Sequence, residues 1–269
     1  MPTTSQLEVN SPMMYSTISD NRIKKYTVRT AVIIFWIAVW QVAACFVSNP
    51  TILPSPLQVA ERLFGLVRLP YFWRSTGLSC LRIIIGFFIG CAVGGLFGVL
   101  TFVSKVSKYL LEPVLLIIKT TPVASFIILL LVWFRNESIP SFISVLIVMP
   151  LICRNVFEAF LSVDKKTLDA AKVFELTFFQ KLKIIYFPAL KSYFLAAFST
   201  SLGFAFKAGI AAEILCTPKN SIGKEIYNAK IYLETESVFA WTAVVIVLSL
   251  LFEVIFVKII MGRRKNDKN

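Results

Sequence analysis

The residues with the most distinctive chemistry are ionisable and hydroxyl groups placed inside long apolar runs. Such groups are costly at membrane depth and usually face a cavity or one another. One interpretation is that Lys119 and Lys207 line a path for an anionic solute. The alternative is that they pair with Glu112, with Glu213 or with backbone carbonyls. For Glu213 itself, helix capping and gating are both open. The candidate path residues are Lys119, Thr120, Thr121, Lys207 and Glu213.

Enzyme and metal chemistry is poorly represented. The chain has no histidine, which excludes a His-ligated metal site. Its five cysteines are scattered without CxxC spacing, as expected of small buried thiols. There is no G-x4-G-K-[ST] phosphate loop and no G-x-S-x-G motif. We therefore expect no catalytic residues, no metal and no cofactor bound by this chain.

Composition indicates a membrane protein. Hydrophobic residues make up 57% and charged residues 16% of the chain, and the mean hydropathy is +0.75. Soluble domains usually carry about 45–50% apolar and about 25% charged residues. The net charge of +13 could suit nucleic acid. However, the cations border apolar runs instead of forming a basic stripe, so we expect the lipid bilayer and no nucleic acid as partner.

Six segments reach the length of about 20 mostly apolar residues that a span requires. They are residues 28–47, 78–103, 109–134, 139–160, 186–215 and 238–261. The sequence therefore predicts an all-α, six-span helical bundle. Residues 28–261 form its transmembrane domain, between a polar tail at 1–27, disordered over 1–21, and a basic tail at 262–269. Within the second span, Gly90, Gly94 and Gly98 are spaced four apart, which favours close helix packing.

Charge sets the orientation. More of the Lys and Arg residues between the spans fall on the side of the N-terminus, so we expect both termini in the cytoplasm of a multi-pass cell-membrane protein. The first apolar run holds Trp36 and Trp40 and lacks a small-residue cleavage site. It is therefore predicted to be an uncleaved span and not a signal peptide.

Two segments outside the spans have helix-start signals. Ser55, Pro56 and Gln58 predict a capping box with proline at N1, opening an amphipathic interfacial helix on the outer surface. Between the fourth and fifth spans, Asp164 can cap a helix to about residue 175. Thr177 with Gln180 (a second capping box) can open another. This charged helix–turn–helix at about 163–188 is either a docking element on the cytoplasmic side or an ordinary loop.

The same segment carries a family resemblance. Asp169, Ala170 and Ala171, followed by Ile185 and Pro188, resemble the E-A-A-x3-G-x9-I-x-L-P signature of permeases in bacterial binding-protein-dependent ABC importers. Asp169 and Phe187 are conservative replacements in that signature. Glu175 stands where the family has glycine, at a turn in which a positive φ is easy only without a Cβ. The turn is therefore expected to be rearranged or strained, at a cost of about 1 kcal/mol.

Two further stretches resemble the nitrate, sulfonate and taurine branch of these permeases. One is Leu53-Pro54-Ser55-Pro56, and the other runs through 211–213, 220–223 and 227–229. The resemblance implies an assembly of two permeases and two cytoplasmic ATPase subunits that use ATP and Mg. We expect a second copy of this chain as the other permease, a homodimer, with a heterodimer as the alternative. An extracytoplasmic binding protein would deliver a small anionic solute of the sulfonate, nitrate, taurine or vitamin-precursor class. The coupling contact to the ATPase is implied for Asp169, Ala170, Ala171, Lys172, Phe174, Glu175 and Leu176.

The main alternative function is an ion-coupled secondary transporter. Such proteins use intramembrane carboxylates and are often built from inverted repeats. Here the spans hold few acids, and neither the glycine-rich nor the proline-broken span recurs in the other half of the chain. The sequence therefore favours an importer permease that leaves ATP hydrolysis to a separate subunit.

Overall fold

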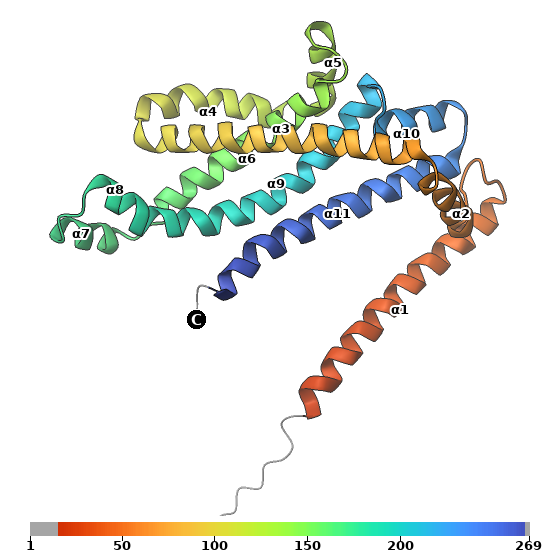
Figure 1. Ribbon diagram of the computed structural model, residues 1–269, viewed down its shortest axis with the longest axis horizontal. Coiled ribbons are helices and arrows are strands. Elements are labelled where there is room, and N and C mark those ends of the chain that lie inside the picture. Colours follow the sequence, from red (N-terminus) through yellow and green to blue (C-terminus); the bar gives the residue numbers. More distant parts are fainter. Residues whose placement is uncertain (1–15, 267–269) are drawn as a thin grey trace, which may run out of the picture.

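The computed structural model describes residues 16–266, and the side chains of residues 27–255 apart from those at positions 29, 178, 179, 182 and 192. Every element in this part of the chain is helical (Figure 1). The elements are α1 (Ser16–Val47), α2 (Pro56–Val67), α3 (Pro70–Val103), α4 (Lys105–Thr120), α5 (Val123–Trp133), α6 (Ile139–Leu161), α7 (Lys165–Val173), α8 (Phe178–Lys181), a π-helical turn (Leu182–Tyr186), α9 (Phe187–Cys216), α10 (Ile222–Ile231) and α11 (Thr235–Asn266).

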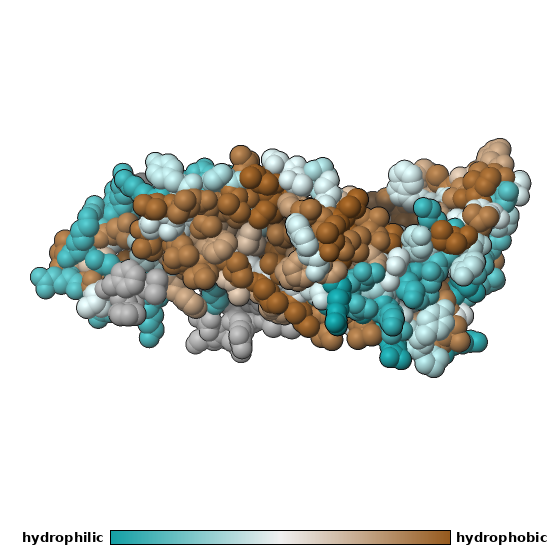
Figure 2. Space-filling view, turned by 90° about the horizontal axis from the view of Figure 1, so that it is seen from above, coloured by the Kyte–Doolittle hydropathy of each residue, from teal (hydrophilic) through white to brown (hydrophobic). Residues whose placement is uncertain are grey.

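The expected all-α membrane bundle is confirmed. Five helices are long and apolar enough to cross a bilayer: α1, α3, α6, α9 and α11. A space-filling view shows a broad apolar band across the molecule, with hydrophilic residues gathered toward its two ends (Figure 2). We call these the elbow end, with α7 and α8, and the loop end, with α2 and α10.

The predicted third span is not one continuous helix. Residues 109–134 form α4 and α5, which meet at an angle of 104° and count as a sixth span only as a bent pair. The break lies at Thr121 and Pro122, both in extended conformation. A residue before proline is disfavoured in the helical region, and proline itself donates no hydrogen bond. These two effects end α4 at Thr120.

The tightest packing in the bundle joins α3 to α6. A Cβ added at Gly90 would lie 2.8 Å from the Cβ of Val148, and one at Gly94 would lie 2.5 Å from the carbonyl oxygen of Met149. The predicted close approach of helices is therefore confirmed at these glycines. Around this seam lies an apolar core with fully buried Phe87. Its ring meets that of Phe198 edge-on, with centroids 4.6 Å apart.

Helix α1 stands away from the bundle along most of its length (Figure 1). Within its apolar window at Thr30–Val47, Ala44 is the only buried residue. It is attached near the loop end, where Trp40 stacks on Phe239 with ring centroids 5.6 Å apart and donates a hydrogen bond to the Pro54 carbonyl at 3.1 Å. The helix begins at Ser16, inside the predicted disordered tail, and α11 likewise continues into the predicted basic tail. Residues 1–15 and 267–269 of those tails lie outside the described residues.

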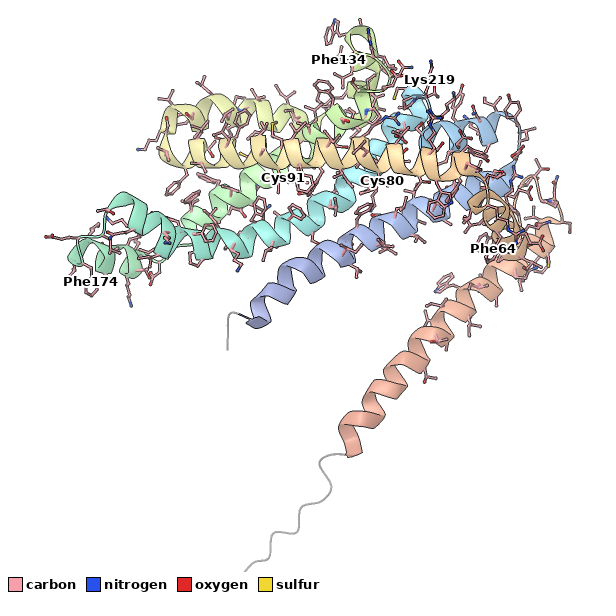
Figure 3. The ribbon with its side chains drawn as sticks, viewed as in Figure 1. Phe64, Cys80, Cys91, Phe134, Phe174 and Lys219 are labelled. Atoms are coloured by element: carbon pink, nitrogen blue, oxygen red, sulfur yellow. The ribbon has the colours of Figure 1, made fainter. Side chains whose placement is uncertain are left out.

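Helix α2 begins as predicted. Ser55 is the N-cap with a complete capping box to Gln58, and Pro56 is the first helical residue. Its inner face packs toward α11, and Arg62 on this helix pairs with Glu234 at 2.7 Å. The opposite face leaves Phe64 exposed at the loop end (Figure 3). Placement of α2 at the membrane surface stays a prediction.

Candidate coupling elbow and solute path

The elbow consists of residues 164–186 and has the predicted helix–turn–helix form. Asp164 caps α7 by accepting a hydrogen bond from the Lys166 amide at 3.3 Å. Thr177 and Gln180 form the second capping box, with the Thr177 amide donating to the Gln180 side chain at 2.8 Å. The short helix α8 then passes through the π-helical turn into α9. Local capping chemistry therefore fixes both arms of the elbow.

Glu175 holds the turn between the two arms. Its φ of 49° lies in the left-handed region. The Glu175 amide donates to the Lys172 carbonyl at 3.0 Å, and the Leu176 amide donates to the Ala171 carbonyl at 3.0 Å. This is the Schellman arrangement that normally has glycine at the left-handed position. The turn is not rearranged, so the glutamate bears the strain expected for a residue with a Cβ.

The tip of the elbow exposes apolar side chains. Val173 is 81% and Phe174 is 77% exposed, and Phe174 lies at the far end of the molecule (Figure 3). Beside them, Lys172 donates a hydrogen bond to Asp169 at 2.8 Å. This hydrogen bond and the Asp169 charge raise the pKa of Lys172 above its ordinary value. An exposed aromatic flanked by an oriented ion pair is a surface that another protein can bind.

The two central alanines of the elbow differ in their surroundings. Ala171 is only 2% exposed and packs inside the elbow, whereas Ala170 faces outward. A large side chain at Ala171 would therefore disrupt the elbow itself. Of these two alanines, only Ala170 can take a larger side chain without disturbing the fold of the elbow.

Glu213 lies wholly buried near the loop end of α9. Its Oε2 accepts hydrogen bonds from Ser79 Oγ at 2.7 Å and from the Gly223 amide at 3.2 Å. Its Oε1 lies 3.4 Å from the Arg82 guanidinium. Since Gly223 is in the first turn of α10, a negative charge here stabilises the free amides and the dipole of that helix. Of the two roles left open for Glu213, this is the geometry of a helix cap.

Arg82 and Ser79 are site residues that the sequence analysis missed. Arg82 on α3 also donates to the carbonyls of Lys219 at 2.8 Å and Asn220 at 3.3 Å, in the loop between α9 and α10 (Figure 3). Ser79 accepts from the Ile222 amide at 2.9 Å. The sequence does carry a signal for Arg82, because it is a single arginine inside a long apolar run. The argument used for Lys119, that a charge at membrane depth is costly, applies to Arg82 equally.

Lys119 and Lys207 occupy different surroundings. Lys119 lies on the wall of a cavity of about 450 Å³ between α3, α4 and α6, which Lys207 does not line. Lys207 is exposed on α9, with its ammonium 5.9 Å from the Phe204 ring centroid. Within the described part of the chain, neither lysine forms an ion pair. A pairing with Glu213 was one of the alternatives left open for the two lysines, and Glu213 is paired with Arg82 instead.

Thr120 and Thr121 use their hydroxyls locally. Thr120 Oγ1 donates to the Leu116 carbonyl at 2.9 Å, and Thr121 Oγ1 donates to the Ile117 carbonyl at 2.8 Å. These carbonyls lie in the last turn of α4, where the Ile117 carbonyl also accepts the Thr121 amide at 3.0 Å, so the hydroxyls add to the backbone hydrogen bonds of that turn. The two hydroxyls therefore finish the broken helix end and remain available to a solute only as acceptors.

Comparison with known proteins matches this architecture to one family. The model of the "Binding-protein-dependent transport system inner membrane component" family covers residues 83–264, which is more than half of the chain and includes α6, the elbow and α9. The chain belongs to this family of importer permeases.

Relatives with known names agree with this assignment. A permease of Bacillus subtilis named for aliphatic sulfonates transport is 27% identical over 207 residues, covering 76% of this chain and 74% of its own. The taurine transport system permease protein of Escherichia coli is 23% identical, covering 80% of each chain. The nitrate import permease protein of Synechocystis is 28% identical, covering 66% of this chain and 68% of its own.

The family settles several points of function. This permease is a multi-pass inner-membrane transport component and not an enzyme, and it works with an ATPase subunit and a solute-binding protein. The predicted resemblance to the nitrate, sulfonate and taurine branch is confirmed by the named relatives. The alternative of an ion-coupled secondary transporter is replaced by this assignment.

Proposed function

We propose that the elbow is the coupling element through which the ATPase drives this permease. The contact is made by the exposed side chains at the elbow tip, above all Phe174 and Val173, with Asp169, Ala170, Lys172 and Glu175 around them. The observation that best supports this proposal is the Schellman turn at Glu175, which fixes the direction of α8 relative to α7. A rigid elbow transmits displacement into α9, whereas a flexible loop would absorb it.

We further propose that the elbow and both termini face the cytoplasm, where the ATPase binds ATP and Mg. This chain then binds no nucleotide and no metal of its own. The permeated solute is a small anion of the sulfonate, nitrate, taurine or vitamin-precursor class. Support comes from the named relatives and from the cations Lys119 and Lys207 within the spans.

The break between α4 and α5 supports a homodimer with the path beside it. Helix α4 buries none of its side chains in the single chain, and Pro122 is exposed at the break. Non-helical backbone at membrane depth is tolerated only against protein or beside a water-filled path. A second copy facing Thr121 and Pro122 meets that requirement. In this arrangement α4 and α5 of two copies enclose the path.

The coupling role is tested by Ala170→Arg in the permease–ATPase complex, reconstituted with its binding protein in proteoliposomes. Burying an unmatched cation at the contact should reduce ATP-dependent uptake by at least about tenfold, with unchanged insertion of the permease. Ala170→Ser, which adds only a hydroxyl at the same exposed position, is the matched control. Normal uptake and normal ATPase co-purification with the arginine variant would remove the elbow from the coupling role.

A further inference from the structure

Three aromatic side chains from three different elements meet at the base of the elbow. Phe102 of α3 and Phe160 of α6 stack with ring centroids 4.5 Å apart and planes 13° from parallel. Tyr186, the last residue of the elbow, packs its ring against both, 5.2 Å from Phe160 and 5.9 Å from Phe102. We call these three residues the base cluster. Through it the elbow contacts two helices other than α9, into which its backbone continues.

The backbone joint between the elbow and α9 is less regular than the helices on either side of it. The π-helical turn Leu182–Tyr186 closes its hydrogen bonds over five residues instead of four, a rare form that is often found at functional sites. Pro188 follows in the first turn of α9 and donates no amide hydrogen bond. Helices kink mainly at such π-turns and prolines. A force on the elbow would therefore bend this joint before it moved α9 as a whole.

The base cluster lies on the same seam that holds α3 against α6. Gly98 is one turn before Phe102 on α3. Val156 is likewise one turn before Phe160 on α6. A Cβ added at Gly98 would lie 2.7 Å from the Cβ of Val156, so the two helices are in close contact directly beside the stacked rings. A side chain that displaces these rings therefore moves α3 and α6 as one body.

Two neighbouring aromatic residues at the joint differ in their surroundings. Tyr186 is half-buried against the apolar core, to which the buried Phe160 belongs. Phe187, the next residue, is 65% exposed and takes no part in the base cluster. Of these two rings, only that of Tyr186 can press on the bundle when the elbow moves.

We propose that the ring of Tyr186 carries the displacement of the elbow onto Phe160 and Phe102, and so onto the joined helices α3 and α6. The backbone joint bends, while the ring contact transmits the movement. This inference rests on the proposed coupling role of the elbow and adds the residues through which the movement leaves it.

The movement is measured by double electron–electron resonance on the permease–ATPase complex in nanodiscs, with and without ATP and vanadate. Nitroxides are attached at Lys165→Cys in the elbow and Leu96→Cys on α3, two exposed positions, in a Cys45→Ser background. Dilution with unlabelled chain keeps the measured distance within one copy. Because elbow and α3 move together, their distance should change by less than about 2 Å, the size of a helix shift at an interface. In Tyr186→Ala the elbow moves alone, and the change should exceed this value.

A second measurement is the stimulation of ATP hydrolysis by the binding protein, a signal that must cross the bundle to reach the ATPase. Tyr186→Ala should reduce the stimulation by about fivefold, within the range for residues that carry coupling, with the ATPase still bound. Tyr186→Phe keeps the ring and should retain the stimulation.

Two further variants test whether the effect belongs to the base cluster. Phe187→Ala removes the neighbouring exposed ring and is the matched control, for which we expect full stimulation. Phe102→Leu should reduce the stimulation, and adding Tyr186→Ala to it should cause no further loss, because both changes break one contact. Phe102→Leu keeps an apolar side chain, so it also serves for the distance measurement if Tyr186→Ala does not insert.

Other outcomes overturn the inference in distinguishable ways. Equal loss in Phe187→Ala would mean that any change at the joint disturbs coupling. A double variant whose loss is the product of the two single losses would mean that Tyr186 and Phe102 act separately. Loss of ATPase co-purification in Tyr186→Ala would assign this residue to the docking contact.

The coupling role of the elbow itself is judged by Ala170→Arg. Normal uptake in that variant removes the proposed function. Impaired uptake in Ala170→Arg, beside a Tyr186→Ala variant with normal stimulation and an unchanged label distance, removes this inference alone.

Discussion

At position 175 a glutamate occupies a backbone conformation in which a Cβ meets the neighbouring carbonyl oxygen. The turn keeps this conformation because the surrounding hydrogen bonds require it, with the amides of Glu175 and Leu176 both satisfied. The sequence predicted the conflict but not its outcome. Whether the strain is borne or relieved depends on the balance between those hydrogen bonds and the steric cost, and only the folded geometry shows it.

Glu175→Gly should stabilise the elbow by about 1 kcal/mol, because glycine adopts a positive φ without that steric cost. Hydrogen–deuterium exchange of the amides in α7 and α8 should then slow by about fivefold. Glu175→Ala removes the same carboxylate but keeps the Cβ, and its exchange should stay near that of the natural protein. Equal slowing in both variants would show that charge and not backbone strain is responsible.

For the buried carboxylate Glu213, the sequence predicted importance but not the binding partners. Its cost at membrane depth marked it as important, and capping was one of the roles considered. Its partners Arg82 and Gly223 could not be found, because they come from other helices and only the fold brings them together. Lys119 and Lys207 were grouped by type, yet the structure places them in separate surroundings.

At the scale of elements, the spacing of Gly90, Gly94 and Gly98 predicted a close approach of helices at these glycines but not that α6 is the partner of α3. A Cβ at Gly94 would collide with the Met149 carbonyl, whereas one at Gly95 meets nothing within 4 Å. Proline positions predicted the ends of helices less well. Pro113 and Pro150 lie inside helices α4 and α6, while Pro122 ends one. A proline leaves a backbone carbonyl without its amide donor. Whether the helix continues depends on what the neighbouring elements offer that carbonyl, and sequence spacing does not encode this.

Gly94→Ala should destabilise the bundle by about 1–3 kcal/mol, since the methyl group must push α3 away from α6. Gly95→Ala, one residue along the same helix, should stay within about 1 kcal/mol of the natural protein. Thermal unfolding in detergent, followed by tryptophan fluorescence, compares the two. Similar midpoints for both variants would mean that α3 and α6 are not in the close contact described.

At the scale of the whole molecule, hydropathy predicted five of the six spans as single helices, because each needs only a long apolar run. Hydropathy does not predict the bend in the remaining span, because α4 and α5 together are as apolar and as long as a straight helix would be. The arrangement also separates two exposed markers, Phe174 at the elbow and Lys219 in the loop before α10, at opposite ends (Figure 3).

This separation makes the orientation measurable. In a Cys45→Ser background, which removes the exposed natural thiol, Phe174→Cys should react with a membrane-impermeant maleimide only from the cytoplasmic side. Lys219→Cys should react only from the outside. The four remaining cysteines are half-buried or buried. Labelling of both positions from one side would contradict the proposed topology.

The sparse attachment of α1 gives this helix the mechanics of a lever arm. Its fulcrum is at Trp40, where the indole is held by Phe239 and the Pro54 carbonyl. From there to Ser16 the helix runs for about 36 Å. A tilt of about ten degrees at the fulcrum would swing the far end by about 6 Å. In the topology proposed above, small movements at the outer surface are thus magnified on the opposite side of the bilayer.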